Sequence, residues 1–310
     1  MTISETPTRP SPSPRPGAVP PASGEHLLQR VILPRTGDPM SVRSLYLDER
    51  TGIRLTAVPA VTGGETPKKV TLAGSAVSAR RLRATSRTSA VVPEQSEVSF
   101  GAYFNAFAAG YWRRWSRLTE VHLKLSLDGA GRVDVYRTKS DGSTIFERGV
   151  VVSGRQDLDL PLDLRPFEDG GWYWFDLTTD EGELTLLGGG WYAADEPSGR
   201  AAVAVGTPTF NRPADCVATL AALGEDPLVR EALTAVIVSD QGTKKVRDEP
   251  GFEQAAAVLG DKLKIVDQPN LGGSGGYARI MYEALEHTDC EQILFMDDDC
   301  LLYTSPSPRD

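Results

Sequence analysis

Short alternating segments dominate the chain from residue 25 to about residue 200. Hydrophobic and polar side chains alternate strictly over residues 121–127, which places one set of them on a single face of a strand. Asp128-Gly129 follows and predicts a turn. Further strand candidates are residues 133–136, 172–177 and 183–187. Strands this short, separated by regular turns, predict an antiparallel β-sandwich over residues 25–200.

The pattern changes near residue 201, where continuous apolar runs alternate with helix-period segments. The predicted strands are residues 201–205, 233–238, 263–266 and 292–296. The predicted helices between them are residues 216–223, 252–259 and 277–287. We expect Asp215 to cap the first helix, since its carboxylate can accept the free N–H groups of the first turn. Apolar strands separated by helices predict a doubly wound α/β domain with a parallel sheet.

Composition narrows the classes of function. The 310 residues carry a formal charge of −9, which disfavours a nucleic-acid partner because phosphate binding needs many cations. Three cysteines without a CxxC pair form no disulfide framework or zinc knuckle, so a reducing compartment is expected. No apolar run approaches the roughly 18–20 residues that cross a bilayer, and no signal peptide is evident. Seven of the 22 prolines fall in residues 1–24, which predicts an extended, solvated tail.

Polar residues follow all four predicted strands of the α/β region, where ligands bind in open parallel sheets. These residues are Asn211 and Arg212, Asp240 and Gln241, Asp267 and Asn270, and Asp297 to Asp299. In an extended backbone, Asp297 and Asp299 point to one side and Asp298 to the other. Two such carboxylates suit Mn²⁺ or Mg²⁺, which can bridge the two phosphates of a nucleotide diphosphate. The plainer alternative is a solvated acidic turn.

Two neighbouring features are weaker signals. Five small residues, Gly272 to Gly276 with Ser274 at the centre, precede the helix expected from Tyr277, and their backbone N–H groups could approach a phosphate. They lack the lysine of a P-loop and follow the third strand rather than the first. Arg212 suits a phosphate or a uracil carbonyl, and an ordinary surface arginine is the alternative. Asp240 suits a hydrogen bond from a base or a ribose.

Aromatic residues are concentrated in the β region. All five tryptophans lie between residues 112 and 191, and six aromatic side chains surround Arg113 and Arg114 within residues 103–115. Such rings can stack on sugar faces, but large aromatics also fill sandwich cores. A carbohydrate-binding β-sandwich without enzymatic activity therefore stays open as an alternative.

The four motifs of the α/β region, taken together, resemble the family 2 glycosyltransferases of GT-A fold. They read FNRPADC, IVSDQG, DQPNLGGSGGYARIMYEAL and QILFMDDD. Within that family they are most similar to the polymerising galactofuranosyltransferases that build cell-wall galactan in mycobacteria and corynebacteria. The resemblance is strong over residues 201–299 and looser over the β region. Another family 2 nucleotide-sugar transferase, or a nucleotidyltransferase with a similar half-domain, is the second alternative.

The resemblance implies a UDP-galactofuranose donor, a lipid-linked galactan acceptor, alternating 1→5 and 1→6 β-linkages and inversion at the anomeric carbon. It assigns the uridine diphosphate part of the donor to Arg212, Gln241, Asn270 and Asp297, and the metal, Mn²⁺ or Mg²⁺, to Asp297 and Asp299. It places the enzyme in the cytoplasm, at the inner face of the plasma membrane. Peripheral membrane association and homo-oligomer formation are further expectations.

The resemblance ends at Asp299. Residues 300–310 match nothing expected of the family and are similar to translated sequencing-adapter read-through, so a non-native tail is expected there. Family members continue for several hundred residues that supply the catalytic base, a histidine metal ligand and the acceptor site. We therefore expect residues 201–299 to be a partial GT-A domain, without catalytic residues, in an inactive and poorly stable fragment. Its last strand would expose an edge prone to association.

Overall fold

The computed structural model describes residues 25–50, 81–139, 141–168, 170–194 and 201–299. The segments 1–24 and 300–310, predicted as a tail and a non-native end, lie outside the described residues. The structure divides into two compact units, Met1–Glu196 and Pro197–Asp310, which are described separately below. Among the described residues, no helix combines the length and the apolarity that a membrane span requires.

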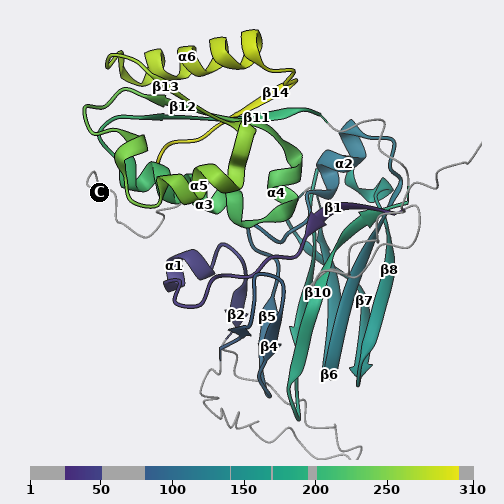
Figure 1. Cartoon of the computed structure of the whole chain (residues 1–310). Coiled ribbons are helices and arrows are strands. Elements are labelled where there is room, and N and C mark those ends of the chain that lie inside the picture. The colour runs from purple at the N-terminus through teal and green to yellow at the C-terminus, as the bar shows by residue number, and fades with distance from the viewer. Residues whose placement is uncertain (1–24, 51–80, 140, 169, 195–200, 300–310) are drawn as a thin grey trace, which may run out of the picture. The chain divides into compact units, whose positions relative to one another are not determined.

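The first unit is an antiparallel sheet of ten strands, in agreement with the predicted antiparallel β domain (Figure 1). Its strands are β1 (His26–Arg30), β2 (Asp48–Arg50), β3 (Arg83–Ala84), β4 (Ala90–Val92), β5 (Glu97–Ser99), β6 (Glu120–Thr138), β7 (Thr144–Ser153), β8 (Gln156–Asp163), β9 (Tyr173–Thr178) and β10 (Leu184–Ala193). Its helices are α1 (Met40–Arg43), α2 (Ala109–Trp115) and the 3-10 helix Arg165–Phe167. The sequence pattern did not predict α2, which has seven residues and lies inside the aromatic cluster.

The longest strand, β6, joins two groups of strands. Its first half pairs with β8 and β10, and its second half pairs with β7 and β9. The predicted turn at Asp128-Gly129 is wrong, because the strand runs through both residues. Gly129 has φ +123°, and a Cβ atom there would lie 2.2 Å from the Glu183 carbonyl oxygen. The glycine therefore permits a close strand contact at the change of partners rather than a reversal of the chain.

Aromatic side chains from both groups of strands meet in one core. Trp191 of β10 stacks on Phe107 with ring centroids 4.9 Å apart, and Tyr173 of β9 lies 6.2 Å from the same indole ring. All three side chains are buried. The inward residues of β6, Leu123 and Val133 among them, belong to the same cluster. The core interpretation of the aromatics is therefore correct for this subset.

The second unit contains a parallel sheet of four strands in the order β13-β12-β11-β14. The strands are β11 (Val203–Thr209), β12 (Leu233–Asp240), β13 (Leu263–Asp267) and β14 (Gln292–Phe295). The helices are α3 (Pro213–Glu225), α4 (Pro227–Ala232), α5 (Phe252–Leu259), α6 (Gly272–His287) and the 3-10 helices Val246–Asp248 and Gly260–Lys262. The parallel order agrees with the predicted alternation of strands and helices.

Helices cover both faces of this sheet (Figure 1). Val205 of β11 packs in a cluster with residues of α3 and α5, whereas the adjacent Ala204 packs with Ile280 and Ala284 of α6. Successive residues of a strand point to opposite faces, so both must be apolar when both faces are covered. This explains the uninterrupted apolar runs in the sequence.

Two helix starts differ from those predicted. Helix α3 begins at Pro213 with Arg212 at its N-cap, so Asp215 is not the cap but lies in the first turn. Proline is favoured at that first position because its fixed φ suits the helix and it lacks an N–H group. Helix α6 begins at Gly272, not at Tyr277, and therefore includes the glycine run.

Candidate functional site

The connections of the parallel sheet reverse direction between β11 and β14. From β11 the chain passes to β12 and then β13, and it returns through α6 to β14 on the other side of β11. Open α/β sheets bind ligands beside the carboxyl ends of the strands at such a switch point. Arg212 follows β11 there, and Asp297 to Asp299 follow β14. Tertiary structure thus brings together motifs that are more than eighty residues apart.

Arg212 connects the two strand ends. Its Nη1 donates to Oδ2 of Asp299 at 2.8 Å, and its Nε donates to Oδ2 of Asp215 at 2.7 Å. The hydrogen bonds to Asp299 and then to Asp215 raise the pKa of the guanidinium further above its usual value. The side chain is 44% exposed. A cation that is partly open to solvent at this edge can exchange a carboxylate for an incoming anion.

The three consecutive aspartates have three different environments. Strand β14 ends at Phe295, and Asp298 and Asp299 lie in a turn, so the predicted extended alternation is wrong. Asp297 is exposed and accepts a hydrogen bond from the Tyr277 hydroxyl. Asp299 is half-buried beside Arg212. The structure therefore places both predicted metal ligands in the short segment after β14, each with its own protein partner.

Asp298 is the buried member of the three. Its Oδ2 accepts a hydrogen bond from the Thr209 hydroxyl at 2.7 Å, and its backbone carbonyl accepts one from the Thr219 hydroxyl at 3.0 Å. Burial raises the pKa of its carboxyl group. These contacts fasten the aspartate turn to β11 and α3. The sequence offered no specific signal for either threonine.

Gln241 and Asn270, both predicted to hold the uridine diphosphate, lie at the start of α6. The Gln241 side chain is buried: its Oε1 accepts from the Leu271 backbone N–H at 2.9 Å, and its Nε2 donates to the Gly272 carbonyl at 3.1 Å. The exposed Asn270 accepts from the Gly272 N–H at 2.9 Å. Gln241 therefore fixes the position of the α6 start relative to β12, while Asn270 faces solvent.

Two further polar residues hold the loops around the site. Asn211 has φ +55°, and its Oδ1 accepts from the backbone N–H groups of Thr243 at 2.8 Å and Lys244 at 3.0 Å. Asparagine tolerates this left-handed conformation better than most residues, which is the sequence signal that could have identified it. Asp240 uses both carboxylate oxygens on the backbone N–H groups of Gly242 and Val246. This differs from the predicted bond to a base or ribose.

The glycine run is part of a packed helix rather than a loop. A Cβ atom on Gly276 would lie 2.7 Å from Cβ of Pro208 and 2.9 Å from Nε2 of Gln241. The absence of a side chain therefore lets α6 approach β11 closely. On Gly273, in contrast, an added Cβ atom would meet nothing within 4 Å. Gly276 is therefore needed for helix packing, whereas Gly273 has room for a side chain.

A second group of potential metal ligands lies in the first unit. Within the described residues, ligating atoms of Glu25, His122 and Asp159 all lie within 4.8 Å of one another. The Lys124 ammonium is 2.6 Å from a Glu25 oxygen and 2.9 Å from an Asp159 oxygen. A lysine cation therefore already neutralises these carboxylates, which is the usual arrangement of an ion-pair cluster.

Comparison with known proteins gives consistent matches. Residues 54–194 match the family profile described as Galactofuranosyltransferase 2 N-terminal. The chain is 54% identical over 277 residues to the galactofuranosyltransferase GlfT2 of Mycolicibacterium smegmatis, covering 88% of this chain and 39% of that protein. It is 54% identical over 280 residues to GlfT2 of Mycobacterium tuberculosis, covering 89% of this chain and 40% of that protein. The chain spans about two fifths of the length of these curated relatives.

A solved structure of a mutant of the carbohydrate-binding module CBM29-2 aligns with a TM-score of 0.23 and 12% identity, covering 34% of this chain and 71% of that one. A score this low carries no argument about fold or ligand. The sequence matches show what the chain is similar to, namely galactofuranosyltransferases named GlfT2. The matched family profile describes the N-terminal region of such proteins.

Proposed function

We propose that the protein transfers galactofuranose from UDP-galactofuranose to a growing, lipid-linked cell-wall galactan, with inversion and with the help of a divalent cation. The observation that carries this proposal is the meeting of Arg212 with the aspartate turn at the switch point of the parallel sheet. The similarity to GlfT2 galactofuranosyltransferases supports the galactofuranosyl group as the one transferred. The second unit would then be the nucleotide-binding half of a GT-A domain.

The donor set fits a hard divalent cation. Asp297 and Asp299 offer carboxylate oxygens that solvent can reach, and oxygen is the ligand type that Mn²⁺ and Mg²⁺ prefer. When bound, the cation would neutralise charge on the leaving diphosphate. Arg212 would turn from Asp299 toward the diphosphate, which frees that carboxylate for the cation. The ion pair seen here therefore holds both groups close to their place of use.

Uridine recognition is assigned to the start of α6. Asn270 is exposed and close to the first turn of that helix, so its amide group is suited to direct contact with the nucleotide. Gln241 is already bonded to the backbone of Leu271 and Gly272, so it is suited to holding that surface in place. The lipid-linked acceptor and the location at the cytoplasmic face of the plasma membrane rest on the family resemblance alone.

Calorimetric titration of the 310-residue chain with UDP, with and without MnCl₂ or MgCl₂, tests the proposal. We expect UDP binding that the metal strengthens, and weaker binding of GDP and dTDP. Arg212→Gln and Asp299→Asn should each weaken metal-assisted UDP binding about tenfold or more, since each removes a charge-assisted contact. Arg165→Gln is the matched control, because Arg165 also pairs with a neighbouring aspartate but lies in the first unit.

The proposal fails if the folded chain binds no UDP at millimolar concentration with either metal. It also fails if Asp299→Asn leaves the metal dependence of UDP binding unchanged. Equal affinity for UDP, GDP and dTDP would instead support a nucleotide-sugar transferase of different donor specificity.

A further inference from the structure

Several large aromatic side chains of the first unit remain outside its core, and three of them lie together. Tyr111 is 69% exposed, Trp115 is 73% exposed and Trp172 is 43% exposed. The buried rings of Phe107, Tyr173 and Trp191 already supply the aromatic core described above. Grouped aromatic surface that stays in water in a folded domain commonly marks a binding site.

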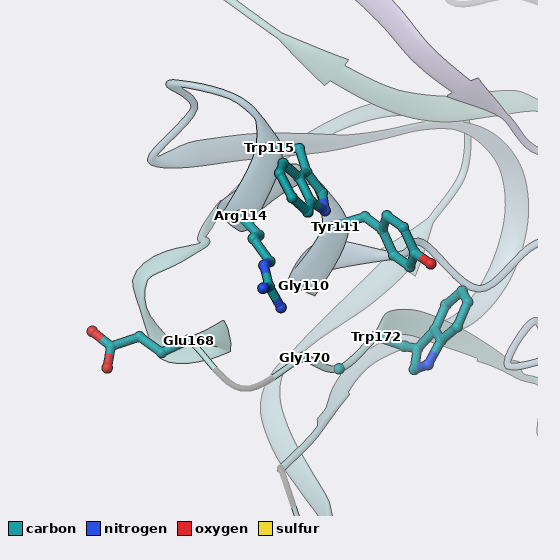
Figure 2. A pocket seen from close by; sticks show the side chains of 8 residues that line it. Gly110, Tyr111, Arg114, Trp115, Glu168, Gly170 and Trp172 are labelled. Atoms are coloured by element: carbon teal, nitrogen blue, oxygen red, sulfur yellow. The ribbon is translucent and has the colours of Figure 1, made fainter.

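These three rings line one pocket of about 440 Å³ (Figure 2). Its lining residues come from α2 and, between the 3-10 helix and β9, from Glu168 and residues 170–172. Figure 2 shows the Arg114 side chain next to the Trp115 ring. A volume of this size falls within the usual range for small-ligand sites. All lining residues belong to the first unit.

The floor of the pocket is rigid backbone. Gly110 of α2 donates its N–H group to the Gly171 carbonyl at 3.0 Å, and a Cβ atom on Gly110 would lie 2.5 Å from Cα of Gly170. The Trp172 N–H group donates to the Thr138 hydroxyl at 3.0 Å. The helix carrying Tyr111 and Trp115 is thereby fastened to the segment carrying Trp172. The backbone segments that carry the rings are thus joined before any ligand arrives, which reduces the entropic cost of binding.

The two charged residues that line the pocket point in different directions. The Arg114 guanidinium lies 5.1 Å from the centre of the Trp115 ring, and Glu168 lies at the margin with its side chain directed away from the rings (Figure 2). The guanidinium N–H groups of Arg114, next to an aromatic ring, suit sugar hydroxyl groups, whose oxygens accept hydrogen bonds.

From these features we propose that this pocket binds a galactofuranose oligosaccharide, a segment of the polymer that the proposed function extends. The C–H faces of the sugars pack on Tyr111, Trp115 and Trp172, because these faces are apolar and the rings offer rigid apolar surface. Sugar hydroxyl oxygens accept hydrogen bonds from Arg114. The choice of this polymer rests on the proposed function, whereas the preference for a saccharide rests on the aromatic rings of the pocket itself. The pocket thus retains the galactan product on the first unit.

Titration of the 310-residue chain with a linear β-galactofuranose hexasaccharide tests this inference, with tryptophan fluorescence and calorimetry as readouts. We expect saturable binding, and weaker binding of a β-galactopyranose hexasaccharide. Trp172→Ala and Tyr111→Ala should each weaken binding about tenfold or more, since both remove a ring that packs on the ligand. Tyr103→Ala is the control, because Tyr103 is 76% exposed but outside the pocket.

Each variant is also titrated with UDP and MnCl₂, and its thermal unfolding is compared with that of the parent chain. Unchanged UDP affinity and unfolding temperature in Trp172→Ala show that the loss is confined to the pocket. Absence of saturable hexasaccharide binding in a chain that still binds UDP overturns the pocket assignment and leaves the proposed function intact. Equal binding by Trp172→Ala, or equal affinity for the galactopyranose chain, overturns it as well. If the chain binds the hexasaccharide but not UDP, the proposed function is overturned and not the pocket assignment.

Discussion

Single polar residues at the strand ends use their hydrogen bonds on the protein's own backbone. Asn211 bridges to the loop after β12, Asp240 closes that same loop, and Gln241 holds the start of α6. The sequence drew attention to this edge of the sheet because polar residues there follow apolar strands. It did not separate residues that face a ligand from residues that hold the loops, since both tasks use the same side chains.

Replacement of Asn211 tests this structural role. Asn211→Gly keeps the left-handed backbone conformation but removes the oxygen that accepts from Thr243 and Lys244. We expect the free energy of unfolding to fall by about 1–2 kcal/mol, measured by urea titration. Asn211→Asp retains an acceptor at the same place and should lose less. A glycine variant as stable as the parent would show that the oxygen is unimportant.

At the scale of elements, α6 shows how packing decides the meaning of a motif. A run of four glycines and a serine is compatible with a phosphate-binding loop, with a flexible linker and with a closely packed helix start. The close approach of Gly276 to Pro208 and Gln241 shows that the run is the start of a closely packed helix. Strand β6 is a second case in which a local motif did not determine the structure. Asp128-Gly129 predicted a turn, but the strand continues through both residues.

Two alanine substitutions in α6 should have opposite effects. Gly276→Ala places a methyl group against Pro208 and Gln241, and we expect a loss of about 1–3 kcal/mol in the free energy of unfolding. Gly273→Ala meets no neighbour within 4 Å, and the higher helix propensity of alanine should stabilise the protein by up to about 1 kcal/mol. Chemical denaturation of both variants measures the difference. Equal effects at the two positions would contradict the packing explanation.

At the scale of the whole molecule, the described residues form separate hydrophobic cores. One cluster lies entirely within the first unit, and two clusters cover the two faces of the parallel sheet in the second. Each unit therefore has a hydrophobic core of its own among the residues described. Chains built in this way commonly depart from a single two-state transition.

Calorimetric unfolding should therefore resolve two transitions. Gly206→Ala is a selective perturbation, because a Cβ atom there would lie 2.2 Å from Cγ2 of the buried Ile280. Overpacking of this kind costs about 1–3 kcal/mol, so the transition of the second unit should move to lower temperature. The unfolding temperature of the first unit should not change. A single transition that shifts as a whole would show that the units unfold together.

The sequence by itself determined the alternation of strands and helices in the second unit, the buried strands of its parallel sheet and the chemical character of the polar edge of that sheet. It could do so because periodicity and apolar runs are local properties, set by which faces of an element must be covered. Tertiary structure alone decided that Arg212 pairs with Asp299, that Asp298 is the buried aspartate, and which tryptophans line a pocket instead of a core. Those outcomes depend on contacts between residues far apart in the chain, and no local pattern encodes them.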